Sequence, residues 1–256
     1  MTDTYTTGLE GVDVLTGGLH AGTVTVVLGT SQSGMSTLLD TCVRANAFTH
    51  HTPAMICDRE TPAQDRVKRI MSGLSGVNLA TIQRGKFTDV QRDRLRRAAD
   101  ATQAAPLLFS NDHTVDRLRW SIIGTPPRTR VVAVDGMRFL DFSDTVTPDH
   151  DRNVLSELCE MARDLNVAVV ATHPLSVHAS GRVPTIADVP DGFASLADTV
   201  LLLNRPGLAA TGRRWESTHS DLVEVICVKA RLGQFGTTSL VADFERAQFI
   251  SAAMAA

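Results

Sequence analysis

Thr23–Thr37 reads TVTVVLGTSQSGMST, an apolar run followed by a turn of glycine and serine and then the start of a second segment. A continuous β-branched run predicts a strand that is covered on both faces, as in a parallel sheet. Similar runs recur at Ala54–Cys57, Leu107–Ser110, Val131–Asp135, Val167–Thr172, Thr199–Leu203 and Leu222–Val228. Helical periodicity separates them, over Ser36–Phe48, Thr61–Leu74, Thr88–Ala101 and Asn153–Leu165. This alternation predicts an α/β fold with a mainly parallel, twisted sheet flanked by helices.

The end of the chain has a different pattern. Thr237–Ile250, TTSLVADFERAQFI, alternates partly with a period of two, which predicts antiparallel strands at one edge of the sheet. Long polar connections are also present, at Asp141–Asp151, Pro174–Pro190 and Gly207–Asp221. Long loops are uncommon in compact domains and often carry function.

The composition is that of a packed globular protein, with 43% hydrophobic and 21% charged residues and a net charge of −3. The acidic balance argues against a protein that coats nucleic acid by charge alone. A length of 256 residues fits one domain, so we expect residues 1–256 to form a single domain. The N-terminus has neither the basic region nor the apolar run of a secretory signal, and no stretch approaches the roughly 20 apolar residues of a membrane-spanning helix. We therefore expect a cytoplasmic protein without a membrane partner.

The turn has the spacing of a phosphate-binding loop, Gly29-x4-Gly34-Met35-Ser36. Consecutive backbone amides and the positive end of the following helix can hold an anion there. The candidate nucleotide-binding residues are Gly29, Thr30, Ser31, Gln32, Ser33, Gly34, Met35, Ser36 and Thr37. Ser36 has the hydroxyl that would hold Mg²⁺, but Met35 stands where such loops carry a lysine for the β and γ phosphates. A turn that merely connects a strand and a helix is the alternative.

The order of the motifs points to a known family. Thr7–Gly29, TGLEGVDVLTGGLHAGTVTVVLG, resembles the segment that leads into the P-loop of RecA-like ATPases. The whole chain, from about Thr6 to Phe249, looks most like the C-terminal motor domain of DnaB-type replicative helicases. The resemblance implies a RecA-like P-loop fold, ATP and Mg²⁺ as cofactors, single-stranded DNA as a partner, and a homo-hexamer or a hetero-oligomer with a related ATPase. The N-terminal primase-interacting domain of the family has no counterpart in this sequence.

Two carboxylates follow predicted strands at the places where the family has its acidic residues. Ile56–Arg69, ICDRETPAQDRVKR, resembles the segment with the catalytic glutamate, and Glu60 matches that residue. A carboxylate there would polarise the attacking water. Val131–Asp135, VVAVD, resembles the Walker B motif, so Asp135 would orient Mg²⁺ together with Ser36. A solvated helix cap is the alternative for Glu60, and a structural role is the alternative for Asp135.

Two further motifs are similar to those of the family. Thr172 and His173 occupy the sensor position, where a serine followed by glutamine is usual, and Thr172 keeps the hydroxyl. Val228–Gly233, VKARLG, resembles the KxRxG signature. In ring-forming relatives its lysine and arginine reach the γ-phosphate of a neighbouring subunit, which assigns that role to Lys229 and Arg231. A structural histidine and a solvated hairpin pair are the alternatives.

The polar segment Ser176–Asp188 falls where these helicases carry a DNA-binding loop of the central channel. Arg182 is its only arginine, and it has no lysine. One guanidinium and backbone amides can contact phosphates. A plain surface loop is the alternative.

Three functions remain open from the sequence. The first is a DnaB-like, DNA-associated ATPase whose hydrolysis is impaired because Met35 replaces the P-loop lysine, since losing a phosphate-binding lysine commonly lowers the rate by about 10²-fold or more. The second is an inactive scaffold or regulatory pseudo-ATPase. The third is another RecA-like ATPase, such as a recombination mediator. Glu60, Asp135, Lys229 and Arg231 favour the first.

Overall fold

The computed structural model describes residues 3–141, 149–175, 182–206 and 221–251. The helices are α1 (Glu10–Thr16), α2 (Met35–Arg44), α3 (Ala63–Ser75), α4 (Leu79–Arg84), α5 (Asp89–Ala104), α6 (Val115–Gly124), α7 (His150–Leu165) and α8 (Phe193–Leu196). The strands are β1 (Thr4–Tyr5), β2 (Leu19–His20), β3 (Val24–Gly29), β4 (Ala54–Asp58), β5 (Leu107–Ser110), β6 (Val131–Asp135), β7 (Ala168–Pro174), β8 (Thr199–Asn204), β9 (Leu222–Ala230), β10 (Gly236–Asp243) and β11 (Gln248–Ser251).

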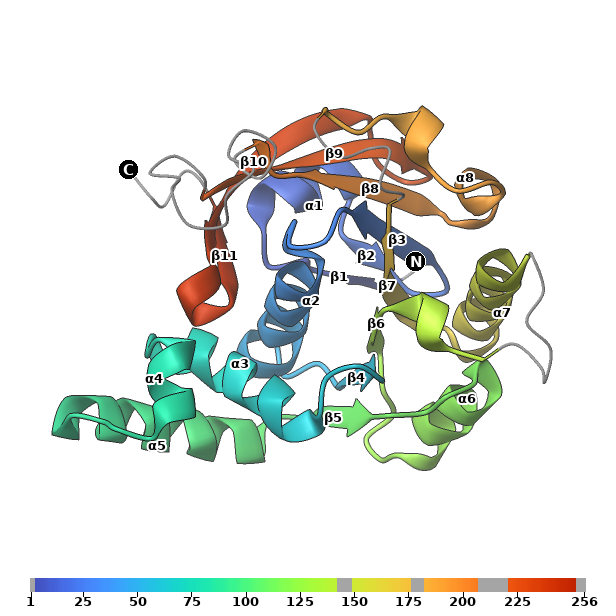
Figure 1. Cartoon of the computed structure of the whole chain (residues 1–256). Helices are drawn as coiled ribbons and strands as arrows, with labels where there is room; N and C mark the ends of the chain where they lie inside the picture. Colours follow the sequence, from blue (N-terminus) through green and yellow to red (C-terminus); the bar gives the residue numbers. More distant parts are fainter. Residues whose placement is uncertain (1–2, 142–148, 176–181, 207–220, 252–256) are drawn as a thin grey trace.

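Within the described residues, nine strands form one sheet in the order β11-β10-β9-β8-β3-β7-β6-β4-β5 (Figure 1). The strands from β8 to β5 run parallel to their neighbours. From β8 onward the chain turns back on itself, and β9, β10 and β11 pair antiparallel. The predicted fold class is therefore confirmed, including the antiparallel strands at the C-terminal edge.

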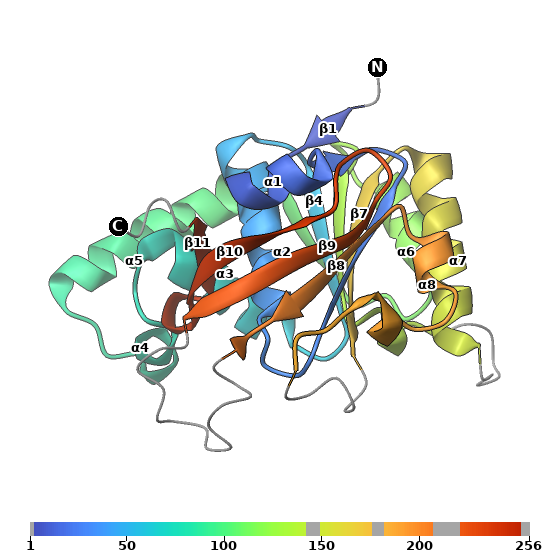
Figure 2. The same cartoon turned by 90° about the horizontal axis from the view of Figure 1, so that it is seen from above.

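Helices cover both faces of the sheet, so that the core has two halves (Figure 2). One face packs against α6 and α7, whose buried residues include Leu118, Ile122 and Leu158. The other face packs against α1, α2 and α3 through residues such as Leu38 and Ile70. The parallel strands read as continuous apolar runs because both of their faces are buried in this way.

Some local structure differs from the sequence expectation. The predicted helix over Ser36–Phe48 is α2 followed by a π-helical turn at Ala45–Thr49. The expectation did not include α1, α4 and α6, nor the small β1–β2 ribbon. The three long polar connections lie partly outside the described residues, at 142–148, 176–181 and 207–220. No helix among the described residues is long and apolar enough to cross a membrane.

The register of the parallel strands fixes where polar side chains meet. β3 ends at Gly29, opposite Pro174 of β7, and β4 ends at Asp58, opposite Asp135 of β6. Because the strands are parallel, these ends lie along one edge of the sheet. Open α/β sheets bind their ligands at this carboxyl edge.

The turn between β9 and β10 lies directly against α1. A Cβ added to Gly233 would lie 2.2 Å from the carbonyl oxygen of Leu15 and 2.7 Å from the carbonyl carbon of Thr16. The backbone amide of Gln234 donates a hydrogen bond of 2.7 Å to Leu15. Glycine at 233 is therefore required by a close approach of two backbones.

Gly233→Ala is expected to lower the free energy of unfolding by about 1–3 kcal/mol, because backbone atoms cannot yield to the new methyl group as a side chain would. Chemical denaturation measures the change. Gly124→Ala is the matched control, because nothing lies within 4 Å of its added Cβ. That variant is expected to stay within about 0.5 kcal/mol of the parent. Equal stabilities of the two variants would contradict the close approach.

Candidate functional site

The loop between β3 and α2 has the backbone of an anion cradle. Gly34 is the N-cap residue of α2, at φ 104°, and no side chain caps the helix. The first amides of a helix have no acceptor within it, so those of α2 are available to a ligand. Gln32 also has a positive φ of 67°. The Ser33 hydroxyl is buried and has no hydrogen-bond partner among the described residues.

Residues far along the chain hold this loop in place. The Arg205 guanidinium donates to the Gln32 carbonyl at 3.2 Å and lies 4.3 Å above the ring of Phe244. A Cβ at Gly34 would lie 2.7 Å from the ring of Phe249. The C-terminal edge of the sheet therefore packs on the loop and restricts its conformation.

Asp135 lies at the end of β6, beside the loop. Its Oδ1 accepts a hydrogen bond of 2.8 Å from the Thr172 hydroxyl, and the Thr172 hydroxyl accepts one of 2.7 Å from the Gly136 amide. Burial by itself raises the pKa of Asp135, but Arg66 and the hydroxyl groups of Ser36 and Thr172 outweigh it and hold the pKa below its usual value. Asp135 is therefore a stable anion, and Ser36, Thr172 and Asp135 lie together.

A buried guanidinium from α3 contacts the same carboxylate. The Arg66 side chain is only 1% exposed, and its Nη1 contacts Oδ2 of Asp135 and lies 3.0 Å from Oδ2 of Asp58. Its Nε lies 2.8 Å from Oδ1 of Asp40, an ion pair without the alignment of a hydrogen bond. Three carboxylates from α2, β4 and β6 thus surround one arginine.

Asp40 is completely buried in the middle of α2 and has a second cationic partner. Arg69 Nε donates to Asp40 Oδ2 at 2.8 Å, and Arg69 Nη2 donates to the Thr37 hydroxyl at 3.2 Å. Burial raises the pKa of Asp40, and the two arginines oppose that rise. These contacts attach the loop helix α2 to α3.

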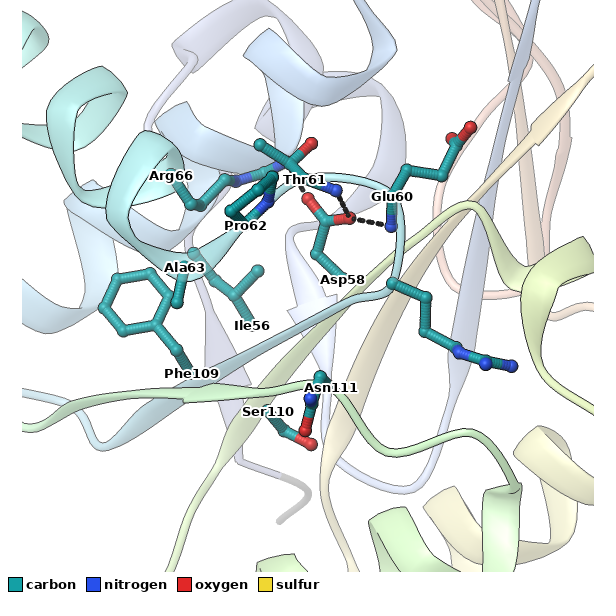
Figure 3. Close-up of a pocket in the computed structure, with 11 residues that line it drawn as sticks. Ile56, Asp58, Glu60, Thr61, Pro62, Ala63, Arg66, Phe109, Ser110 and Asn111 are labelled. Carbon is teal, nitrogen blue, oxygen red and sulfur yellow. Dashed lines mark hydrogen bonds and ion pairs between the residues drawn. The ribbon is translucent and has the colours of Figure 1, made fainter.

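Glu60 lies in the turn between β4 and α3, which Asp58 shapes. Asp58 Oδ1 accepts hydrogen bonds of 2.9 Å from the amides of Glu60 and Thr61 (Figure 3). A cavity of about 400 Å³ lies beside this turn. Figure 3 shows the Glu60 carboxylate pointing away from Phe109 and Asn111 on the far wall of the cavity.

The Glu60 carboxylate is directed toward β6. A Cβ at Gly136, which follows Asp135, would lie 3.5 Å from Glu60 Oε2. Partial burial and the neighbouring Asp135 and Asp58 carboxylates raise the pKa of Glu60. A raised pKa improves a carboxylate as a proton acceptor.

His173 lies at the same edge of the sheet as the loop but is occupied by a neighbour. Its Nε2 lies 2.8 Å from Asp151 Oδ2, and its ring packs edge-on against Phe193 at 5.0 Å. His173 Nδ1 is buried without a partner among the described residues. The structure therefore places His173 near the loop without a contact to Asp135.

The other predicted residues lie away from the loop. Lys229 Nζ donates to the Ala197 carbonyl at 2.5 Å, and Arg231 pairs with Asp198 at 2.9 Å. Asp198 precedes β8, at the end of the parallel strands opposite to Gly29. Arg231 is 69% exposed. Both residues therefore lie at the opposite edge of the sheet from the site.

Arg182 forms an ion pair within its own segment. Its guanidinium binds both oxygens of Asp188, at 2.9 and 2.5 Å. The rest of the predicted DNA-binding loop, residues 176–181, lies outside the described residues. The role of Arg182 in DNA binding stays a prediction.

The loop fits the phosphate groups of a nucleotide, whereas the acidic end fits Mg²⁺ poorly. The uncapped amides of α2 and the unpartnered Ser33 hydroxyl are suited to phosphate oxygens. Asp135, in contrast, already has a donor on each carboxylate oxygen, Thr172 on one and Arg66 on the other. The described residues hold no metal-binding group of three or more histidine, cysteine or acidic side chains.

Sequence reasoning missed Arg66, Asp40 and Asp58. Asp40 carried a signal, because a carboxylate inside the apolar stretch from Leu38 to Val43 requires a buried cation. Arg66 carried none, because its helix has other basic residues at similar positions. Arg205 and Phe244 were also missed, since only the folded chain brings them to Gln32.

The structure is similar to solved ATPase and helicase domains. It matches a chain solved as an isolated ATPase domain with a TM-score of 0.83 and 21% identity, covering 96% of this chain and 90% of that one. It also matches a DnaB-like replicative helicase, solved in a study of its interactions with primase, with a TM-score of 0.85 and 21% identity. That match covers 96% of this chain and 61% of the other. These similarities establish the RecA-like fold.

The sequence is similar to replicative DNA helicases named DnaB. It is 22% identical to the protein of Treponema pallidum over 242 residues, covering 91% of this chain and 53% of that protein. It is 24% identical to the protein of Leifsonia xyli over 212 residues, covering 78% and 46%. The chain therefore spans about half the length of these relatives. The family described as DnaB-like helicase C terminal domain matches residues 5–251, and the chain therefore belongs to that family of helicase ATPase domains.

Proposed function

We propose that the chain binds ATP at the Gly29–Thr37 loop and hydrolyses it slowly. The observation that carries this proposal is Met35. The loop keeps the uncapped amides and the Ser36 hydroxyl, but the position of the phosphate-binding lysine has a side chain with no charge and no donor. The β and γ phosphates are thus held by amides alone, and charge that develops on them during hydrolysis lacks its usual cation.

The remaining residues have the roles that their positions support. Glu60, with its raised pKa and its carboxylate near Gly136, accepts the proton of the attacking water. Thr172 and Ser36 hold Asp135 in place beside the loop. His173 is a positioning residue, because Asp151 and Phe193 engage its ring. Mg²⁺ is part of the family resemblance, but no step of this account requires it.

A ring of such chains would place Arg231 at the site of a neighbour. Arg231 is exposed at the edge of the sheet opposite to the loop, and it lies in a turn that is fixed against α1 by Gly233 and Gln234. A head-to-tail contact between two copies brings opposite edges together. In that contact Arg231 exchanges Asp198 for a phosphate of the neighbour, with Lys229 behind it.

DNA association is proposed on the resemblance and on position. Arg182 and the segment from residue 176 to Asp188 follow β7, at the carboxyl edge of the sheet. Arg182 binds Asp188 in the free chain, so that a DNA phosphate would have to compete with this carboxylate. DNA contact is therefore expected to depend strongly on salt.

A scaffold without hydrolysis is the second candidate. The observation that favours it is Arg66, whose contact with Asp135 occupies the acidic end of the site. Both candidates share the loop, so the variants below distinguish between them.

Met35→Lys is expected to tighten ATP binding by about tenfold or more, because a charge-assisted hydrogen bond to phosphate contributes about 1.5–3 kcal/mol. The new ammonium would face the phosphates across a loop that is already formed. Titration with a fluorescent ATP analogue measures the change, and Met35→Leu is the matched control of similar volume. If Met35→Lys binds ATP no better than Met35→Leu, the loop does not hold phosphates and the scaffold function is correct.

Two inactive variants are expected to complement each other. In the Met35→Lys background, Glu60→Gln removes the proton acceptor and Arg231→Ala removes the guanidinium, so each double variant is expected to lose turnover while the Glu60→Gln chain still binds ATP. In an equal mixture, about a quarter of the contacts between copies combine an intact Glu60 with a neighbour's intact Arg231. Turnover is therefore expected to reappear at about that fraction of the Met35→Lys rate. Glu160→Gln, at an exposed position of α7, is the control substitution. A mixture that stays inactive would show that Arg231 does not act on a neighbour.

A further inference from the structure

The site has exchanged the position of its positive charge. The loop lacks a cation at Met35, while Arg66 places a guanidinium against Asp135, with 1% of its side chain exposed. Arg66 is one helical turn into α3, and its contact reaches a residue 69 positions away in the sequence. The cation is thus part of the folded core rather than of the loop.

The contacts of Arg66 are those of a structural counter-ion. Three carboxylates, Asp40, Asp58 and Asp135, lie around it, and Arg69 neutralises part of the same charge through Asp40. Two guanidinium groups therefore balance three carboxylates. A buried cation with this many anionic partners is held firmly, because moving it would leave unpaired charges in the core.

Asp135 is left with little capacity to bind a metal ion. Its Oδ1 accepts from Thr172, and its Oδ2 is in contact with Arg66. A divalent ion at this carboxylate would lie within a few ångströms of the guanidinium, and the two cations would repel each other. Arg66 Nη2, however, has no hydrogen-bond partner among the described residues, which leaves a donor for an incoming oxygen atom.

We propose that Arg66 is the resident cation of the site: its guanidinium takes the place beside Asp135 that a divalent metal ion would take, so that the chain binds nucleotide without the metal. Nucleotide binding in this proposal rests on the proposed function. Exclusion of the metal rests on the contacts of Asp135 alone. Without a metal ion the phosphates are less polarised, which adds a second reason for slow hydrolysis.

A charge-balanced double variant tests the metal half of the proposal. Asp40→Leu with Arg66→Leu removes one carboxylate and the guanidinium, so that the net charge stays the same while Oδ2 of Asp135 is released. Binding of Mn²⁺ to the full chain, without nucleotide, is measured by electron paramagnetic resonance of the free ion. The affinity is expected to rise by about tenfold or more, because removing a positive charge a few ångströms from a divalent ion has that effect even under strong screening.

The matched control is Asp40→Leu with Arg69→Leu. It removes the same carboxylate and a guanidinium from the same helix, but Arg66 stays on Asp135, because Arg69 contacts only Asp40 and Thr37 in this cluster. Its Mn²⁺ affinity is expected to stay within about threefold of the wild type. A gain equal to that of the Arg66 variant would overturn the proposal.

Asp135→Asn completes the test. In the Asp40→Leu, Arg66→Leu background it is expected to remove the gained Mn²⁺ affinity, and in the wild type it is expected to change little. If circular dichroism shows that the double variant does not fold, the wild type alone decides: Mn²⁺ binding that Asp135→Asn weakens would overturn the proposal, and binding that it leaves unchanged supports it. Absence of ATP binding by the wild type would refute the proposed function and leave the result for the metal in force.

Discussion

Arg66 joins three elements that would otherwise each end in an uncompensated buried charge. Its guanidinium contacts Asp40 in α2, Asp58 at the end of β4 and Asp135 at the end of β6. Taking these groups out of water is costly, and the ion pairs offset that cost only while all partners are present. Removing the arginine alone would leave three carboxylates in the core, a change of about 3–5 kcal/mol.

The position of the loop depends on this cluster. Asp40 lies in the helix that begins at the phosphate-binding loop, so its pairs with Arg66 and Arg69 fix α2 against α3. Asp58 in turn binds the amides of Glu60 and Thr61, which sets the direction of the Glu60 side chain. The loop, the proton acceptor and the Walker B aspartate are thus held by one set of charges. A domain of this family that lacks the loop lysine retains the shape of its site in this way.

The fold could be predicted from the sequence because its signals are local. Apolar β-branched runs mark β3, β6 and β7, and their strand ends locate Asp135 and Thr172 without knowledge of the tertiary structure. α6 could also have been found, since Val115, Leu118 and Ile122 have helical spacing and Thr114 caps the helix. The ion cluster could not, because nothing in the sequence near Arg66 indicates that its partners are 8 and 69 residues away. Roles that depend on a neighbouring copy, as for Lys229 and Arg231, lie beyond both the sequence and one folded chain.

The affinity of the wild-type chain for ATP, measured once with Mg²⁺ and once with EDTA, tests most directly whether the cation of the site is part of the protein. Fluorescence anisotropy of a labelled ATP analogue is suited to the weak binding expected of a loop without lysine. If Arg66 is the resident cation, the two affinities agree within about threefold, since no metal ion contributes to the complex. Binding that occurs only with Mg²⁺ would contradict the account, because it would mean that Asp135 releases Arg66 and takes up the metal.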